Sequence, residues 1–524
     1  MFLTNNPFWY PGLSFIPFFF SYAEIHYHYR FLYPRYFRKE PEIIADLPIR
    51  CIRSISSKLP VLIIVKDSHL FPIELSSISV DISANGSLFS QEFNINEKLT
   101  QKYYSRILEM DISTIISDEQ LSINVTIRYQ INGNKKTVIN DNYPGLKKTP
   151  FECYLTESKL PVPEGWYAGE PHYHSIYTSD QVEFGADIPA TVKMAKAIGL
   201  SWLFITDHSY DLDDSENSYT INDPDIPKWE KMFNDVHHND EKDFRVIPGE
   251  EVSIGNSKGR NVHLLAINHP AFIEGAGDSA EKWFRNKPQR YLQEIEELHS
   301  ESNLFIAAHP NDDISFLQKL TLRRGNWSID DYQNSGIRFL QLINTSHFPD
   351  VLKAVNHWRS LLLQGNRFYI LAGNDAHGNF NVMRQIKTPF WKLFTSHDQV
   401  FGKFFTTFKY KNNDPIQGIK NGELIVSNGP FLSFQLKAKR IYYTIGSTIK
   451  DKSVSLEYET RTAHEFGEIR KLSLYIGDTN SKKENKISNP QNSLKIELPA
   501  RGYARMSMST SQGGFVLTNT VWAE

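Results

Sequence analysis

The chain has 524 residues, of which 40% are hydrophobic and 22% are charged. This composition is typical of a globular protein of about two to four domains, and it excludes low-complexity, collagen-like and coiled-coil chains. The formal net charge of −3 does not indicate binding to nucleic acid. Two cysteines, Cys51 and Cys153, are too few for a disulfide framework or a zinc ribbon, so any metal must be held by histidines and carboxylates.

The first segment, residues 1–44, is strongly aromatic. Pro7, Pro11 and Pro17 interrupt it, whereas a membrane-spanning helix needs about 20 apolar residues. It also lacks the basic start and small-residue cleavage site of a secretory signal. We therefore expect no transmembrane segment and a cytoplasmic location. The segment is expected to pack on the protein's own surface, with contact to lipid or to a partner as the alternative.

Residues 45–160 have the pattern of a β-sandwich-like domain. β-Branched runs at 61–65, 75–82 and 121–129 are separated by turn signals such as Asn132-Gly133, as expected for antiparallel strands. Residues 159–165 are rich in proline and end in glycine, which predicts a linker.

From residue 165 to 430 strands and helices alternate. We expect strands at 202–205, 245–247, 262–267, 304–308, 337–343 and 368–372, and helices at 187–199, 227–238, 281–300 and 350–364. Such alternation predicts an α/β fold with a parallel barrel or a doubly wound sheet. Residues 431–524 return to a β pattern and follow Ser427–Pro430 with almost no linker, which predicts a C-terminal β domain in fixed contact with the preceding one.

Histidines and carboxylates recur near the predicted strand ends. His172 and His174 flank Tyr173 and therefore lie on one face of a strand. The others are Asp180, Asp207, His208, Glu250, Glu251, His263, His309, Asp375 and His377. The carboxyl ends of strands are where α/β barrels build active sites, and imidazole with carboxylate suits Zn, Mn or Fe.

The order His-x-His, Asp, Asp-His, Gly-x-Glu, His, Ala-His-Pro, Asp-x-His resembles the polymerase-and-histidinol-phosphatase (PHP) superfamily of metallophosphoesterases. The flanking β segments and the phrase Ile425–Phe431 resemble its carbaryl-hydrolase-like branch. This resemblance implies a distorted (β/α)7 barrel flanked by N- and C-terminal β-sandwich-like domains. It also implies a centre of two or three divalent metal ions.

The resemblance also implies individual roles. The first metal would be held by His172, His174 and Asp375, with Glu251 bridging to a second metal that His263 and His309 complete. The third would be held by Asp180, His208 and His377, although Asp180 lies one residue further from His174 than in many members. Glu250 remains an alternative to Glu251, because a strand turns only one of them inward. Asp207 is expected to orient a ligand or assist proton transfer, and Lys258, Arg260 and Arg384 are candidates for contacting a phosphate.

The implied function is hydrolysis of a small-molecule phosphoester by a hydroxide on the metals, assisted by Glu251, Asp207, His208 and His377. Hydrolysis of a carbamate or carboxylic ester is the alternative reaction. A non-catalytic binding or scaffold protein with a vestigial barrel is the alternative of another class. The oligomeric state is left open.

Overall fold

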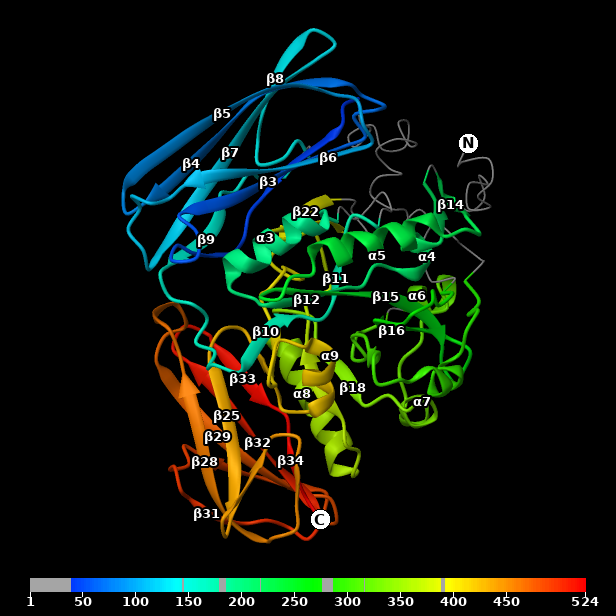
Figure 1. The fold of residues 1–524 in the computed structure, drawn as a ribbon, viewed down its shortest axis with the longest axis vertical. Coiled ribbons are helices and arrows are strands. Elements are labelled where there is room, and N and C mark those ends of the chain that lie inside the picture. Colours follow the sequence, from blue (N-terminus) through cyan, green and yellow to red (C-terminus); the bar gives the residue numbers. More distant parts are fainter. Residues whose placement is uncertain are drawn as a thin grey trace.

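A computed structural model of the chain describes residues 39–143, 146–178, 185–216, 218–275, 286–314, 316–387 and 392–524. The described residues are mostly β, with 45% of them in strands and 16% in helices. Figure 1 shows a β region at each end of the molecule, with the helices gathered around the sheet between them. Most of the aromatic segment 1–44 lies outside the described residues. No described helix is long and apolar enough to cross a membrane.

The N-terminal β region consists of two sheets that share one core. One sheet has the order β1-β3-β6, with β1 (Glu42–Asp46), β3 (Lys58–Lys66) and β6 (Tyr103–Asp111). The other has the order β2-β9-β7-β4-β5, with β2 (Arg50–Ile52), β9 (Phe151–Thr156), β7 (Glu119–Ile131), β4 (Ile73–Ala84) and β5 (Ser87–Leu99), and β8 (Asn134–Ile139) pairs with β7. Alternate residues of β4 and β7, such as Val80 and Val125, face the core, which is the pattern of half-buried strands.

The central sheet carries the candidate site. Its seven strands are β10 (Trp166–Glu170), β12 (Trp202–Ile205), β15 (Arg245–Gly255), β16 (Asn261–Ile267), β17 (Leu304–Ala307), β18 (Phe339–Ile343) and β19 (Tyr369–Ala372). The pairs β10–β12, β12–β15, β17–β18 and β18–β19 are parallel, whereas β16 is antiparallel to both β15 and β17. Each predicted strand of this region is therefore present.

The predicted distorted (β/α)7 barrel is wrong, because these strands form part of an open, mixed sheet. Only five residues separate β15 from β16, and a parallel crossover needs about a dozen. On its other edge β10 pairs antiparallel with β23 (Phe405–Lys409) and not with β19. Among the described strands β19 ends the sheet, which continues past β23 through β24 (Leu424–Ser427) into the C-terminal region.

Helices pack beside strands of the central sheet, and one of them has clear start and stop signals in the sequence. Asp187 caps α3 (Ile188–Ile198) by accepting a hydrogen bond from Ala190 N, and Gly199 ends it in the left-handed conformation. The predicted helices at 227–238 and 350–364 are confirmed as α5 (Pro227–Asn239) and α8 (Phe348–Leu363).

The prediction of a long helix at 281–300 is wrong for the residues of this range that the structure describes. Residues 286–300 contain only two short 3-10 helices, η5 (Leu292–Glu294) and η6 (Glu296–Leu298). Pro288 lies inside the expected helix, and a proline there removes a backbone hydrogen bond and clashes with the preceding turn.

The C-terminal β region extends the central sheet. After β24 the sheet runs through β33 (Phe515–Thr518), β32 (Gly502–Thr510), β29 (Ile469–Asp478) and β30 (Lys483–Ser488), with β27 (Thr448–Ile449) and β34 (Val521–Ala523) at its side. A second sheet, β26 (Ile441–Thr444), β25 (Phe431–Ala438), β28 (Ser453–Arg461) and β31 (Lys495–Glu497), packs on it through a shared apolar core. The side chain of Asn519 joins the two regions by bonding Ile370 N and O.

Shorter elements complete the described chain: β11 (Tyr173–His174), α4 (Ser209–Leu212), β13 (Asp214–Ser215), β14 (Ser218–Asn222), α6 (Phe316–Thr321), α7 (Ile329–Ser335), β20 (Ala376–His377), β21 (Met383–Lys387), β22 (Lys392–Ser396), α9 (Pro415–Asn421) and η7 (His464–Phe466).

Candidate metal centre

One edge of the central sheet gathers eight of the nine predicted ligands. They are His172, His174, His208, Glu251, His263, His309, Asp375 and His377. The parallel pairing of β11 with β20 places His174 opposite His377, and an isolated bridge joins His208 to Glu251. The ninth, Asp180, lies outside the described residues.

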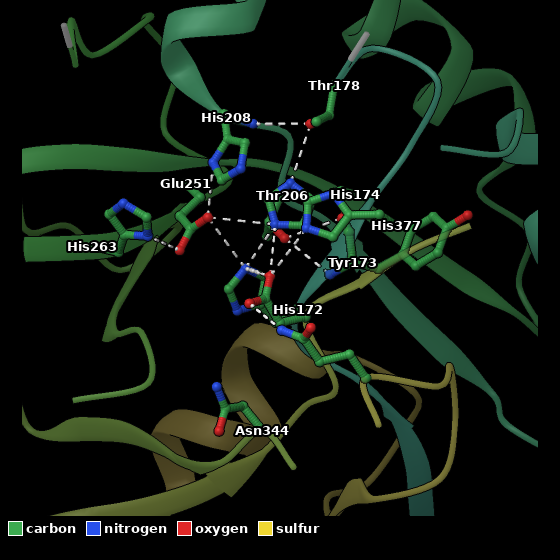
Figure 2. A network of polar contacts seen from close by, with 12 residues as sticks. His172, Tyr173, His174, Thr178, Thr206, His208, Glu251, His263, Asn344 and His377 are labelled. Atoms are coloured by element: carbon green, nitrogen blue, oxygen red, sulfur yellow. Dashed lines mark hydrogen bonds and ion pairs between the residues drawn. The ribbon is translucent and has the colours of Figure 1, made fainter. Parts of the chain in front are cut away.

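The first group contains His172, His174, Glu251 and Asp375. The Nε2 atoms of the two histidines lie 3.0 Å apart. Asp375 Oδ1 lies 3.2 Å from His172 Nε2 and 3.0 Å from His174 Nε2. Figure 2 shows the imidazole rings of His172 and His174 converging on Glu251. These residues are the ones that the sequence assigns to the first metal.

Glu251 connects this group to a second one, made with His263 and His309. Its Oε1 lies 2.6 Å from His263 Nδ1 and 2.9 Å from His309 Nε2. Its Oε2 faces the first group, 3.6 Å from His172 Nε2 and 3.4 Å from His174 Nε2. The carboxylate thus has the placement of a bridging ligand between two metal ions.

The third group contains His174, His208 and His377. The rings of His174 and His377 stack with their centroids 4.1 Å apart, and His208 Nδ1 lies 2.9 Å from Glu251 Oε2. His174 therefore belongs to two groups, a sharing that the sequence does not predict.

A glutamine that the sequence analysis missed determines the tautomer of His172. Gln341 donates from Nε2 to Gly373 O at 3.0 Å, so its Oε1 faces His172 Nδ1 at 2.6 Å. Because an amide oxygen only accepts, Nδ1 must carry the proton. The lone pair of neutral His172 is then on Nε2 and points into the cluster, as metal binding requires.

The donor set fits divalent metal ions. Glu251 Oε2 is buried and accepts no hydrogen bond from the described residues, yet three histidine nitrogens lie within 3.6 Å of it. Imidazole nitrogens and carboxylate oxygens at this spacing suit Zn, Mn or Fe. The three groups share members, so the described residues could hold two or three ions.

The charges of the cluster depend on one another. Burial would raise the pKa of Glu251, but the surrounding histidines, His263 first, hold it well below its usual value. Burial likewise opposes ionisation of Asp375, and His172 and His174 lower its pKa well below the usual range. Both carboxylates are therefore ionised at neutral pH and available to a cation.

Glu250 points away from the cluster. Its Oε1 accepts a hydrogen bond from Ile273 N at 2.9 Å, and its Oε2 accepts one from Ser209 Oγ at 3.0 Å. Burial raises its pKa to about 8. Adjacent residues of a strand face opposite sides, so Glu251 alone of the pair faces the histidines.

Asp207 lies beside the cluster rather than in it. Its carboxylate accepts hydrogen bonds from Ser175 N and Oγ, both at 2.7 Å, and from Thr178 N at 2.9 Å. Thr178 Oγ1 in turn lies 3.2 Å from His174 Nδ1. Asp207 thus fixes the turn that follows His174, which places it among the positioning residues.

Two predicted ligands have unusual backbone conformations. His309 and Asp375 have positive φ values of 28° and 52°, which cost free energy in residues other than glycine. Buried Glu170 supports the loop at Asp375, because its Oε1 accepts from Asn374 N at 2.8 Å. Glu170 precedes His172 by two residues, which is the spacing of residues on one face of a strand. This spacing is a signal in the sequence that could have identified Glu170.

The predicted phosphate-contacting residues are not gathered at the cluster. Arg384 lies 3.0 Å from Asp141 in an ion pair with the N-terminal region. Lys258 and Arg260 line a separate cavity of about 460 Å³ with Arg323. Arg324, which the sequence analysis did not select, contacts His263 through its guanidinium group.

Comparison with known proteins does not identify a family. No family model and no curated protein matches the chain. Among solved structures it is similar to the β-glucuronidase of Parabacteroides merdae, with 9% identity, coverage of 93% of this chain and 64% of that one, and a TM-score of 0.19. It is also similar to the exo-chitosanase CsxA of Amycolatopsis orientalis, with 9% identity, coverage of 92% of this chain and 63% of that one, and a TM-score of 0.18. The chain thus spans less than two thirds of either protein, and TM-scores this low carry no argument about activity.

Proposed function

We propose that this protein is a metal-dependent hydrolase that cleaves a small-molecule phosphoester. The observation that carries the proposal is the overlap of three ligand groups through His174 and Glu251. Residues grouped this closely would hold two or three ions, which would supply positive charge to both the attacking and the leaving oxygen of an in-line displacement. The order of the ligand motifs supports a relation to the PHP superfamily, whereas the open, mixed sheet gives that relation no support.

The chain's own residues would prepare the site. His172, His174, Glu251, His263, His309 and Asp375 would hold the ions, which would supply Lewis acidity and lower the pKa of a bound water. Gln341 keeps the lone pair of His172 directed inward. In the balanced reaction water gives its oxygen to phosphorus, the phosphorus–oxygen ester bond breaks, and one proton passes to the alcohol. His208 and His377, which are 7% exposed each, would move that proton where they do not hold a third ion.

The other two functions predict different results. A carbamate or carboxylic ester hydrolase would cleave aryl carbamates or acetates faster than aryl phosphates. A scaffold protein would purify without stoichiometric transition metal. Elemental analysis of the purified chain, followed by assays on these three ester classes, separates the three.

The adjacent glutamates provide a matched pair of variants. We expect Glu251→Gln to lower metal content and to reduce phosphoesterase kcat at least about 100-fold, because a neutral amide cannot bridge two cations. Glu250→Gln should stay within about threefold of the wild type, because a carboxyl with a pKa of about 8 is largely protonated at pH 7 and resembles an amide. A folded Glu251→Gln protein with normal turnover would contradict the bridging role.

A further inference from the structure

A cavity of about 300 Å³ opens beside the metal centre. His309 lines it and also lies 2.9 Å from Glu251, Nε2 to Oε1. Gln399 forms another part of its wall and donates from Nε2 to Asp375 Oδ2 at 3.1 Å. The cavity therefore shares a wall with the candidate ligands, and a substrate held at the metals would extend into it.

The charged lining of this cavity is mostly negative. Asp312, Asp313, Asp350 and Asp398 line it, and Lys353 is the one lysine or arginine among its described lining residues. The Lys353 ammonium lies 2.6 Å from both carboxylate oxygens of Asp313, so this cation is already paired. We call the space the aspartate cavity.

Neighbouring groups hold two of these carboxylates in place. Asp398 Oδ1 accepts hydrogen bonds from Thr345 Oγ1 at 2.8 Å and from Ser346 N at 2.9 Å. Burial opposes ionisation of Asp398, but these hydrogen bonds hold its pKa below the usual value. Asn344 Nδ2 donates to Asp312 Oδ1 at 3.2 Å. The cavity thus presents fixed hydrogen-bond acceptors.

The basic residues near the centre lie elsewhere. Lys258, Arg260, Lys319 and Arg323 line the separate 460 Å³ cavity, whose described lining includes none of the candidate ligands. Arg324, the next residue, contacts His263. An anionic substituent in the aspartate cavity would face carboxylates without a free cation among the described lining residues. Such a juxtaposition of like charges is unfavourable.

This inference rests on the proposed function. We infer that the aspartate cavity binds the alcohol part of the ester, and that this part offers O–H or N–H donors and carries no negative charge. Hydroxyl and ammonium groups satisfy the carboxylate acceptors, and the phosphate remains at the metals.

Three small esters of similar size test the inference on the metal-loaded full chain: phosphoethanolamine, glycerol phosphate and phosphoglycolate. We expect kcat/KM for the first two to exceed that for phosphoglycolate at least about tenfold. Asp350→Asn should narrow this ratio by about two- to fivefold, as expected for one partly exposed charge. Asp330→Asn is the matched control, because Asp330 is an exposed aspartate in the first turn of α7, as Asp350 is in the first turn of α8, but lies outside the cavity lining.

A second variant tests the same preference by releasing the cation of the cavity. Asp313→Asn removes the partner of Lys353 and should raise kcat/KM for phosphoglycolate relative to phosphoethanolamine. Equal turnover of the three esters, or ratios that neither Asp350→Asn nor Asp313→Asn changes, would overturn the inference and leave the proposed function intact.

Binding of the free alcohols makes the two failures distinguishable. Ligand-observed NMR with ethanolamine, glycerol and glycolate measures occupancy of the cavity without turnover. If no ester is cleaved, the proposed function fails. Weaker ethanolamine binding by Asp350→Asn than by Asp330→Asn would still support the cavity assignment, and equal binding of ethanolamine and glycolate by the wild type would overturn it.

Discussion

Replacing Gln341 with leucine tests whether the cluster is built to bind metal. The side chain is fully buried, accepts from His172 Nδ1 at 2.6 Å and donates to Gly373 O at 3.0 Å. Leucine has similar volume but offers neither group. His172 could then adopt the other tautomer, with its proton on Nε2 and no lone pair directed at the metals.

The size of the effect follows from the role of such outer hydrogen bonds. Loss of the partner of a metal-ligating histidine typically lowers metal affinity about 10- to 100-fold, which is about 1.4–2.8 kcal/mol. The unpaired Gly373 carbonyl and His172 N–H should also lower the free energy of unfolding by about 2–4 kcal/mol. Both are measurable on the full chain, the first by zinc titration against a competing chelator and the second by denaturant unfolding of the metal-free protein.

Two further variants separate the effect of the His172 tautomer from the effect of side-chain packing. Gln341→Glu keeps an acceptor for His172 Nδ1 but loses the donor to Gly373 O, so we expect metal affinity near the wild-type value with reduced stability. Gln364→Leu, at an exposed glutamine after α8, should change neither quantity. If folded Gln341→Leu bound zinc within twofold of the wild type, the argument that Gln341 fixes His172 for metal binding would be refuted.

Other predictions concern the contacts between regions. Burial raises the pKa of Asp46 from 3.8 to about 7, so the folded state keeps a proton that the unfolded state loses between these values. The free energy of unfolding of the wild type, measured relative to that of Asp46→Asn by urea unfolding at each pH, should therefore fall by up to about 4 kcal/mol as the pH rises from 4 to 7. Above pH 7 it should fall no further. A difference between the two proteins that does not change with pH would contradict the raised pKa of Asp46. Asn519→Ala removes the hydrogen bonds to Ile370 N and O and should cost about 2–3 kcal/mol in the same assay, with exposed Asn480→Ala as the neutral control. Deletion of residues 431–524 should cause aggregation, seen by size-exclusion chromatography, because it exposes the edge of β24; a monomeric truncation with unchanged thermal stability would show that the regions are independent.

Local signals in the sequence predicted the elements better than their connections. The cap at Asp187 and the stop at Gly199 define α3, and both depend on neighbouring residues alone. The continuation of the sheet from β24 into β33 depends on residues about 90 positions apart, such as Ile425 and Thr518, and no local pattern encodes that pairing. The hydrophobic periodicity therefore identified the strands but not the direction and order in which they pair. This pairing determines whether a sheet closes into a barrel.

The same limit explains which site residues could be found. Gln341 lies in the apolar strand β18 and has no motif around it, so only the three-dimensional contact with His172 identifies it. Similarly, the choice between Glu250 and Glu251 depends on the register of β15, which pairs Glu251 with Leu265 and Glu250 with Ala266. The residue types at the strand ends predicted a metal centre, and the pairing of the strands brings the candidate ligands together.

His263 shows how the mixed sheet still assembles the centre. The expectation that candidate ligands follow the carboxyl ends of strands holds for His208, His309 and Asp375, which come after β12, β17 and β19. His263 instead lies near the amino end of β16. Because β16 is antiparallel to both neighbours, its amino end meets the edge where the carboxyl ends of the parallel strands lie. The reversal that rules out the predicted barrel is thus also what brings His263 within 2.6 Å of Glu251.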